Sequence, residues 1–412
     1  MKKIINTQRD QERQDSSRNS KGGAQEVLVA LLFSAILLQE LSNNIIRMII
    51  PIDNALGIVM LALCFAIIVV SDFVFSKKII WLIIFILFEF WIGFLRNPGS
   101  ITTEYFLFFL VFGLSGLLGS SMRMNVKKII LSGVIITGIN LIILGQNSTA
   151  YIENHGQFIF GYMMQSGMFV LIIYSLNYIQ EKSLVYKILI LLLTSYTTWL
   201  TISNSGRGSI LCIFMFILIY LIFVSKYKMS KYIGFISIIV GIVMLRSIET
   251  YLVLIDEILR NYDIVIASIQ KSIWLLNHES LMHGRTELYA EVFSFVSLPS
   301  LIFGNGIGFY ERGEFTYTHN LVLSIFSDFG IIGMVGILWG IRKFMGLLKN
   351  EPKEMLFMYT ILIAGTLTKL MFSSTYWYSS SFWLVIGLLL IRNPGVRENN
   401  INKIPNDTVE CT

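Results

Sequence analysis

The feature that most constrains this chain is a series of long apolar blocks, separated by short polar segments, between residues 24 and 391. A helix needs roughly 20 apolar residues to cross about 30 Å of hydrocarbon, and these blocks approach or reach that length. Only 14% of the residues are charged, against about 25% in ordinary soluble domains. The sequence therefore predicts an all-α polytopic membrane protein, because a segment in lipid must satisfy its backbone hydrogen bonds internally.

We predict about twelve transmembrane helices and one large loop. The helices occupy residues 24–38, 55–75, 79–95, 101–118, 129–144, 158–179, 184–202, 209–224, 232–245, 321–341, 355–372 and 381–391. The domain organisation is a disordered polar tail over 1–23, nine transmembrane helices within 24–245, a large loop over 246–320, three transmembrane helices within 321–391, and a second tail over 392–412. The first tail is expected to be disordered because it lacks apolar residues that could form a core.

The distribution of Lys and Arg predicts how the chain is inserted. With the N-terminus in the cytoplasm, every segment expected inside the cell is basic, and these segments hold most of the 32 Lys and Arg residues. The positive-inside rule then places both termini in the cytoplasm and the loop 246–320 outside it. The net charge of +6 is explained by topology, so we expect no binding of nucleic acid. The cations outside the cytoplasmic segments are Arg47, Arg96, Arg207, Arg246, Arg260, Lys271, Arg285, Arg312 and Lys369.

The loop 246–320 is much longer than any other predicted connection. Long ordered loops tend to carry function. Apolar residues recur at helical spacing between residues 249 and 277, which predicts short amphipathic helices. These helices either lie at the membrane interface or pack against the transmembrane bundle, and both interpretations stay open.

Three residues on the outer side of the predicted bundle are candidates for chemistry. Arg207 lies among Ser, Asn and Gly residues, Arg285 lies near an expected helix start, and His319 lies where the loop re-enters the membrane. An Arg in the bilayer is costly and needs a partner or a purpose, and His is the usual proton acceptor at neutral pH. The structural alternatives are an Arg207 that reaches the headgroups, an Arg285 paired with Glu287 or Glu291, and a packed His319.

Several other chemistries have no motif in the sequence. The chain contains no H-E-x-x-H pair, no G-x-x-x-x-G-K-[ST] loop and no outer D-x-D pair, so neither a metal ion nor a nucleotide cofactor is predicted. The cysteines Cys64, Cys212 and Cys411 form no disulfide framework. The energy for a reaction must then come from the substrate itself or from a gradient.

At the three candidate residues, the chain resembles the O-antigen ligase and Wzy polymerase family of bacterial surface polysaccharide enzymes. The first motif is an Arg followed four residues later by Leu at an outer span end, here Arg207 to Leu211. The second is His-Asn, nine further residues and Gly-x-x-Gly, here His319-Asn320 and Gly330 to Gly333. Residues 284–287 and 303–308 also look like the family's large outer loop. The resemblance covers about residues 203–340.

The resemblance implies a GT-C-like membrane glycosyltransferase without a metal cofactor, in the bacterial cytoplasmic membrane, with an extracytoplasmic active site. Its donor is a glycan on a polyprenyl diphosphate such as undecaprenyl diphosphate. The family's arginines are thought to hold that diphosphate and its His to act on the acceptor hydroxyl. Carried over residue by residue, these are Arg207, Arg285 and His319. Further candidates for binding the diphosphate or the glycan are Asn320, Tyr310, Arg312, Tyr317 and Lys369, with packing or interface anchoring as the alternative role.

The expected activity is a Wzy-type polymerase that joins lipid-linked repeat units during synthesis of capsule, O-antigen or exopolysaccharide. A ligase that transfers finished glycan to another acceptor carries the same motifs. A lipid or polysaccharide transporter also suits about twelve spans, but no repeat relates the two halves, and Glu89 is the best mid-span charge. The expected partners are the lipid-linked oligosaccharide, membrane lipids, a flippase and a chain-length regulator.

Overall fold

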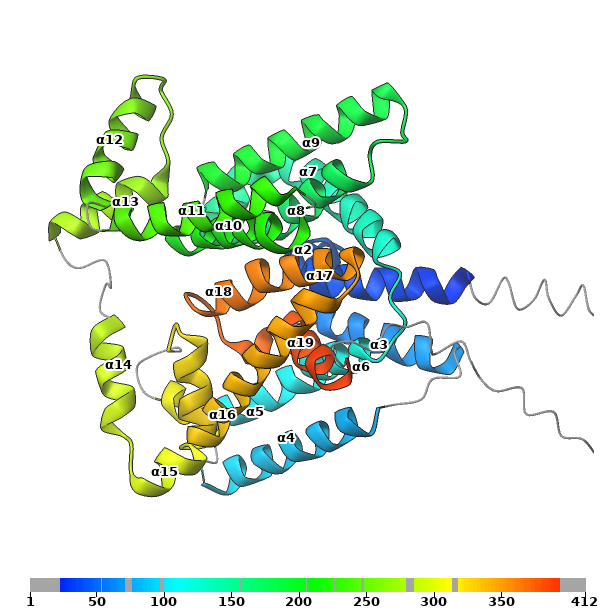
Figure 1. Cartoon of the computed structure of the whole chain (residues 1–412). Helices are drawn as coiled ribbons and strands as arrows, with labels where there is room; N and C mark the ends of the chain where they lie inside the picture. Colours follow the sequence, from blue (N-terminus) through cyan, green and yellow to red (C-terminus); the bar gives the residue numbers. More distant parts are fainter. Residues whose placement is uncertain are drawn as a thin grey trace, which may run out of the picture.

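The structure is a computed structural model, shown in Figure 1, in which every regular element of the described residues is a helix. It describes residues 23–52, 54–70, 76–96, 99–155, 157–204, 206–225, 227–245, 248–278, 285–312 and 318–392. The prediction of an all-α chain with several apolar helices is confirmed for these residues.

The helices follow the apolar blocks along the chain. The first described helix is Gly23–Leu37, followed by α2 (Gln39–Ile49), α3 (Ala55–Val70), α4 (Lys77–Arg96), α5 (Ser100–Phe108), α6 (Leu114–Ser120), α7 (Val126–His155), α8 (Gln157–Asn177), α9 (Leu184–Ser203), α10 (Arg207–Ile219) and α11 (Lys228–Leu245). The remainder contains α12 (Ile248–Arg260), α13 (Ala267–His278), α14 (Arg285–Ser294), α15 (Leu298–Phe303), α16 (Leu321–Asn350), α17 (Lys353–Leu362), α18 (Thr368–Leu370) and α19 (Ser380–Ile391). Short π-helical turns lie at Phe109–Gly113, Tyr220–Val224 and Ile363–Leu367.

The number of helices that could cross a membrane is smaller than the number of predicted spans. Within the described residues, six helices are long and apolar enough, or up to seven if the bent pair Gly23–Leu37 and α2 is one span. Each predicted span is helical over most of its length, but α3 has 16 residues and α19 has 12, less than a full crossing requires. The helices indicate a polytopic membrane protein, whereas the count of twelve spans stays a prediction.

After the first predicted span, the chain continues as a second helix at a sharp angle. The helix Gly23–Leu37 bends by 106° into α2, which buries Leu41 and Ser42 and leaves Met48 and Ile49 exposed. This amphipathic pattern lets α2 lie along the bundle, where it packs against α3, α7 and α8. These residues lie between the first two predicted spans, 24–38 and 55–75.

The described residues of the segment 246–320 form four short helices, α12 to α15, and a 3₁₀ turn at Tyr310–Arg312. Helices α12 and α13 occupy the stretch in which helical spacing predicts amphipathic helices. Figure 1 shows α12 to α15 along the left side of the molecule, whereas the helix Gly23–Leu37 begins on the right. The large predicted loop is therefore largely helical, and it lies at the end of the bundle opposite the first described residue.

Helix α16 is broken at Gly330, the first glycine of the second motif. Gly330 has φ 59° and ψ −146°, a conformation that is essentially open only to glycine. The end of α15 fits into this break, because the backbone N–H of Asn305 donates to the carbonyl of Ser327 at 2.7 Å. The Gly-x-x-Gly motif thus has a structural role: it lets α15 pack closely against α16.

Candidate functional site

Arg207 is the first residue of α10. The preceding residue, Gly206, is extended (φ −86°, ψ 170°), and no side chain caps the helix start. The first backbone N–H groups of a helix have no partner within it, and together with the helix dipole they favour an anion. The guanidinium group of Arg207 lies outside the described residues, so the structure places its backbone only.

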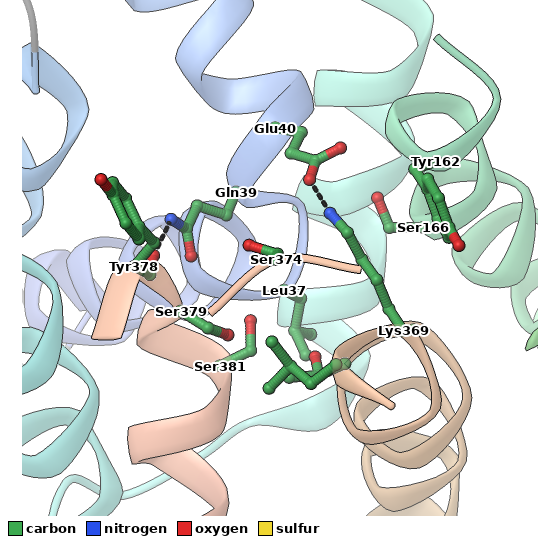
Figure 2. A pocket seen from close by; sticks show the side chains of 13 residues that line it. Leu37, Gln39, Glu40, Tyr162, Ser166, Lys369, Ser374, Tyr378, Ser379 and Ser381 are labelled. Carbon is green, nitrogen blue, oxygen red and sulfur yellow. Dashed lines mark hydrogen bonds and ion pairs between the residues drawn. The ribbon is translucent and has the colours of Figure 1, made fainter. Parts of the chain in front are cut away.

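A cavity of about 120 Å³ lies between α2, α8, α18 and the start of α19. Lys369, a candidate from the sequence, is part of its wall: its Nζ donates a hydrogen bond to Glu40 Oε1 and lies 5.2 Å from the centre of the Tyr162 ring. Figure 2 shows Glu40 and Lys369 pointing toward each other across this cavity. Its lining residues are Leu37, Gln39, Glu40, Tyr162, Ser166, Gly365, Thr366, Lys369, Leu370, Ser374, Tyr378, Ser379 and Ser381.

The start of α10 lies directly beside this cavity. A Cβ atom on Gly208 would come within 1.9 Å of Tyr162 Oη and 3.2 Å of Phe372 Cβ, so α10 contacts α8 and the end of α18 at this point. One turn into the helix, Ser209 Oγ donates to Gln165 Oε1 at 2.7 Å, and both side chains are buried. These contacts fix the first turn of α10, and with it the backbone of Arg207, next to the cavity.

Arg285 is the first described residue of α14, which packs against α16. Its side chain, that of Arg312 and all of Tyr317 lie outside the described residues. Tyr310 is 5% exposed, and its Oη donates to the carbonyl of Leu288 at 3.3 Å and to Glu291 Oε2 at 3.5 Å. Burial, followed by the nearby Glu291 carboxylate, raises the pKa of Tyr310 to about 12. Tyr310 therefore stays protonated and attaches the 310–312 turn to α14, so the packing alternative describes its contacts.

His319 and Asn320 form the entry to α16. His319 has φ 52° and is half-buried. Asn320 Oδ1 accepts from the backbone N–H of Val322 at 3.0 Å and of Leu323 at 3.3 Å, which is the geometry of a helix N-cap. Asn320 of the second motif is expected to bind substrate. In the structure its side-chain oxygen caps α16, and this cap holds His319 just before the helix.

The cap at Asn320 leads to a testable expectation. Asn320→Ala should lower the free energy of unfolding by about 1 kcal/mol, because two backbone donors lose their acceptor. Asn320→Asp should keep that stability, since a carboxylate caps equally well. Thermal unfolding of the purified variants in detergent measures both effects. An Asn320→Ala variant as stable as the parent protein would contradict the capping role.

The turn between α18 and α19 connects the cavity to α16. On one side, Gln39 Nε2 donates to the carbonyl of Tyr378 at 2.7 Å, and Ser380 Oγ donates to Gln39 Oε1 at 2.8 Å. On the other side, Tyr376 Oη and Trp377 Nε1 both donate to Asp328 Oδ2. Asp328 is buried on α16, nine residues after His319. Helix α10 thus packs against α18, and α14 packs against α16. The turn that follows α18 contacts α16 through Asp328.

No family model, no curated protein and no solved structure matches this chain. The chemistry proposed for the site therefore rests on its geometry. In the described parts of the chain, no three His, Cys, Asp or Glu side chains lie together as a metal ion would require.

Sequence reasoning missed Glu40, Gln39 and Asp328. Glu40 lies just beyond the first apolar block and Asp328 lies inside the tenth predicted span. A carboxylate at either place is costly unless it is paired, and that cost was the signal available. Lys369 and Tyr376, which bond to one oxygen of each carboxylate, are more than 40 residues away in the sequence, so only the fold reveals them.

Proposed function

We propose that this chain is a metal-independent glycosyltransferase that joins glycan repeat units carried on a polyprenyl diphosphate, such as undecaprenyl diphosphate. It would work at the extracytoplasmic face of a bacterial cytoplasmic membrane, on a GT-C-like scaffold. The observation that carries the proposal is the position of the motif residues: Arg207 begins α10, Arg285 is the first described residue of α14, and His319 directly precedes the N-cap of α16.

The uncapped start of α10 provides electrostatics that suit transfer from a diphosphate. Helix N-termini offer free N–H donors and positive potential to an anion, and an Arg at the first position adds a planar pair of donors that fits phosphate oxygens. Charge grows on the diphosphate as it leaves. Contacts from Arg207 and Arg285 would therefore strengthen in the transition state, which is the condition for catalysis.

His319 would supply the proton transfer. In the proposed step, the acceptor hydroxyl oxygen attacks the anomeric carbon and the bond between that carbon and the diphosphate oxygen breaks. His319 takes the hydroxyl proton, and the lipid diphosphate leaves with the bonding electron pair. A neutral imidazole is suited to this role because it can accept the proton.

The decisive experiment is reconstitution of the purified protein with a lipid-linked repeat unit and no added metal. Elongated glycan on the carrier lipid is the expected product, and a ladder on gels measures its length. Transfer of glycan to a different acceptor, without elongation on the carrier, would indicate the ligase alternative. Movement of the lipid-linked sugar across the vesicle without a new glycosidic bond would reject the enzyme in favour of a transporter.

A further inference from the structure

We propose that the cavity between Glu40 and Lys369 is a binding site for an uncharged sugar ring, in which Glu40 Oε2 accepts a hydrogen bond from a sugar hydroxyl. This site is separate from the anion site proposed at the start of α10. It deepens the proposed function and rests on it, because it assigns part of the glycan to a defined set of residues.

The charged side chains of the cavity favour a ligand without net charge. Among the described residues that line the cavity, the charged side chains are Glu40 and Lys369, and they pair with each other. The Lys369 side chain is 18% exposed and that of Glu40 37%, so the pair lies partly out of solvent. A diphosphate placed here would face the carboxylate of Glu40 at close range and be repelled. A polar ligand without net charge avoids that cost.

One carboxylate oxygen of Glu40 is a hydrogen-bond acceptor without a donor. Glu40 Oε1 accepts from Lys369, but Glu40 Oε2 is buried and has no hydrogen-bond partner among the described residues. A buried carboxylate oxygen without a donor costs free energy, because it has lost water and gained no replacement. The arrangement is satisfied when a ligand brings a donor to Oε2. Sugar hydroxyls are donors of this kind, whereas phosphate oxygens at neutral pH are mainly acceptors.

The walls of the cavity are rich in hydroxyl groups. Most of the other polar groups that line the cavity are hydroxyls, from Ser166, Thr366, Ser374, Ser379 and Ser381. Hydroxyls both donate and accept, so they can match the alternating donors and acceptors of a sugar ring. Figure 2 shows Tyr162 and Tyr378 on opposite sides of this group with their hydroxyls directed outward. Tyr378 Oη donates to Glu104 Oε1 at 2.7 Å, so the two tyrosines contribute their rings to the walls.

The cavity has room to extend. A second cavity of about 180 Å³ shares Gln39, Glu40 and Tyr378 with the first. It is also lined by Asn43, Asn54 and Arg47, so it too combines one carboxylate with one cation among neutral polar residues. A sugar ring beside Glu40 could therefore continue into a second ring or substituent on the Arg47 side.

The site can be tested by saturation-transfer NMR on the full-length protein in phospholipid nanodiscs free of glycoside detergents. The probes are methyl α-glucopyranoside, methyl α-galactopyranoside and N-acetylglucosamine, with pyrophosphate as the competitor. The parent protein should give a signal with at least one sugar, and pyrophosphate should not displace it. Glu40→Gln should weaken that sugar at least about tenfold, because the hydrogen bond to a charged acceptor is lost.

Matched variants separate binding from folding and from catalysis. Glu26→Gln removes the other Glu–Lys pair made by the N-terminal helices, the exposed pair with Lys128, and should leave sugar binding unchanged. If Glu40→Gln does not fold, Ser166→Val narrows the cavity and should weaken the sugar similarly. Arg207→Ala should keep the sugar signal even though the proposed function expects it to lose polymerisation. Equal binding by the parent and Glu40→Gln, displacement by pyrophosphate, or no sugar signal at all would overturn the assignment.

Discussion

Replacing Arg207 with alanine is expected to slow polymerisation of the lipid-linked repeat unit by about 100-fold or more, with no loss of folded protein. The physical reason is that a donor aimed at charge developing in the transition state contributes on the order of 100- to 1000-fold to the rate. Arg207 also begins α10 beside the Lys369 cavity, so its loss removes positive charge from the helix start best suited to an anion. Initial rates of glycan elongation by reconstituted protein measure the effect.

The chemistry of the side chain provides a second comparison at the same position. Arg207→Lys should recover only part of the activity, because an ammonium group supplies the charge without the planar pair of donors. Arg260→Ala is the matched control: Arg260 lies on α12, its side chain is 61% exposed, and its Nε is 2.8 Å from Asp256 Oδ2. A surface pair of this kind contributes little, so this variant should elongate glycan normally. Normal chain length from Arg207→Ala would reject the proposed role.

The apolar helices could be predicted because they depend on composition over long windows. The apolar blocks gave the positions of the helices, since a chain in lipid has few alternatives to a helix. The bend after Leu37 could not be predicted in the same way. It depends on α2 finding a surface formed by α3, α7 and α8, and no local pattern describes that surface.

The candidate site was only partly accessible from the sequence. Lys369 was found because a cation near the end of an apolar block is expensive, but its partner Glu40 is 329 residues away. Asn320 and Tyr310 were recognised as polar residues near a motif. Their hydrogen bonds to α16 and α14 are structural, which a motif cannot distinguish from contact with a ligand. The spacing of a motif constrains which residues lie together, but not what each one bonds to.

Gly330→Ala is expected to lower the free energy of unfolding by at least about 3 kcal/mol, or to prevent folding, for two additive reasons. Alanine strongly disfavours φ 59° with ψ −146°. In addition, its Cβ would lie 2.6 Å from the backbone N of Gly304 and from the carbonyl C and O of Ile302. These are backbone atoms of α15 and its end, so they cannot rotate away as a flexible side chain could. The yield of monodisperse protein and its thermal unfolding measure the loss.

Gly336→Ala is the control, because it lies six residues later in the same helix with no neighbouring atom within 4 Å of an added Cβ. Alanine favours a helix over glycine by up to about 1 kcal/mol, so this variant should be as stable as the parent or more so. If Gly330→Ala proved equally stable, the close contact between α15 and α16 would be wrong.

The contact also sets the direction in which the first part of α16 leaves the break, and with it the position of His319. A Gly330→Ala protein that still folds should therefore lose glycan elongation more than it loses stability, whereas Gly336→Ala should lose neither.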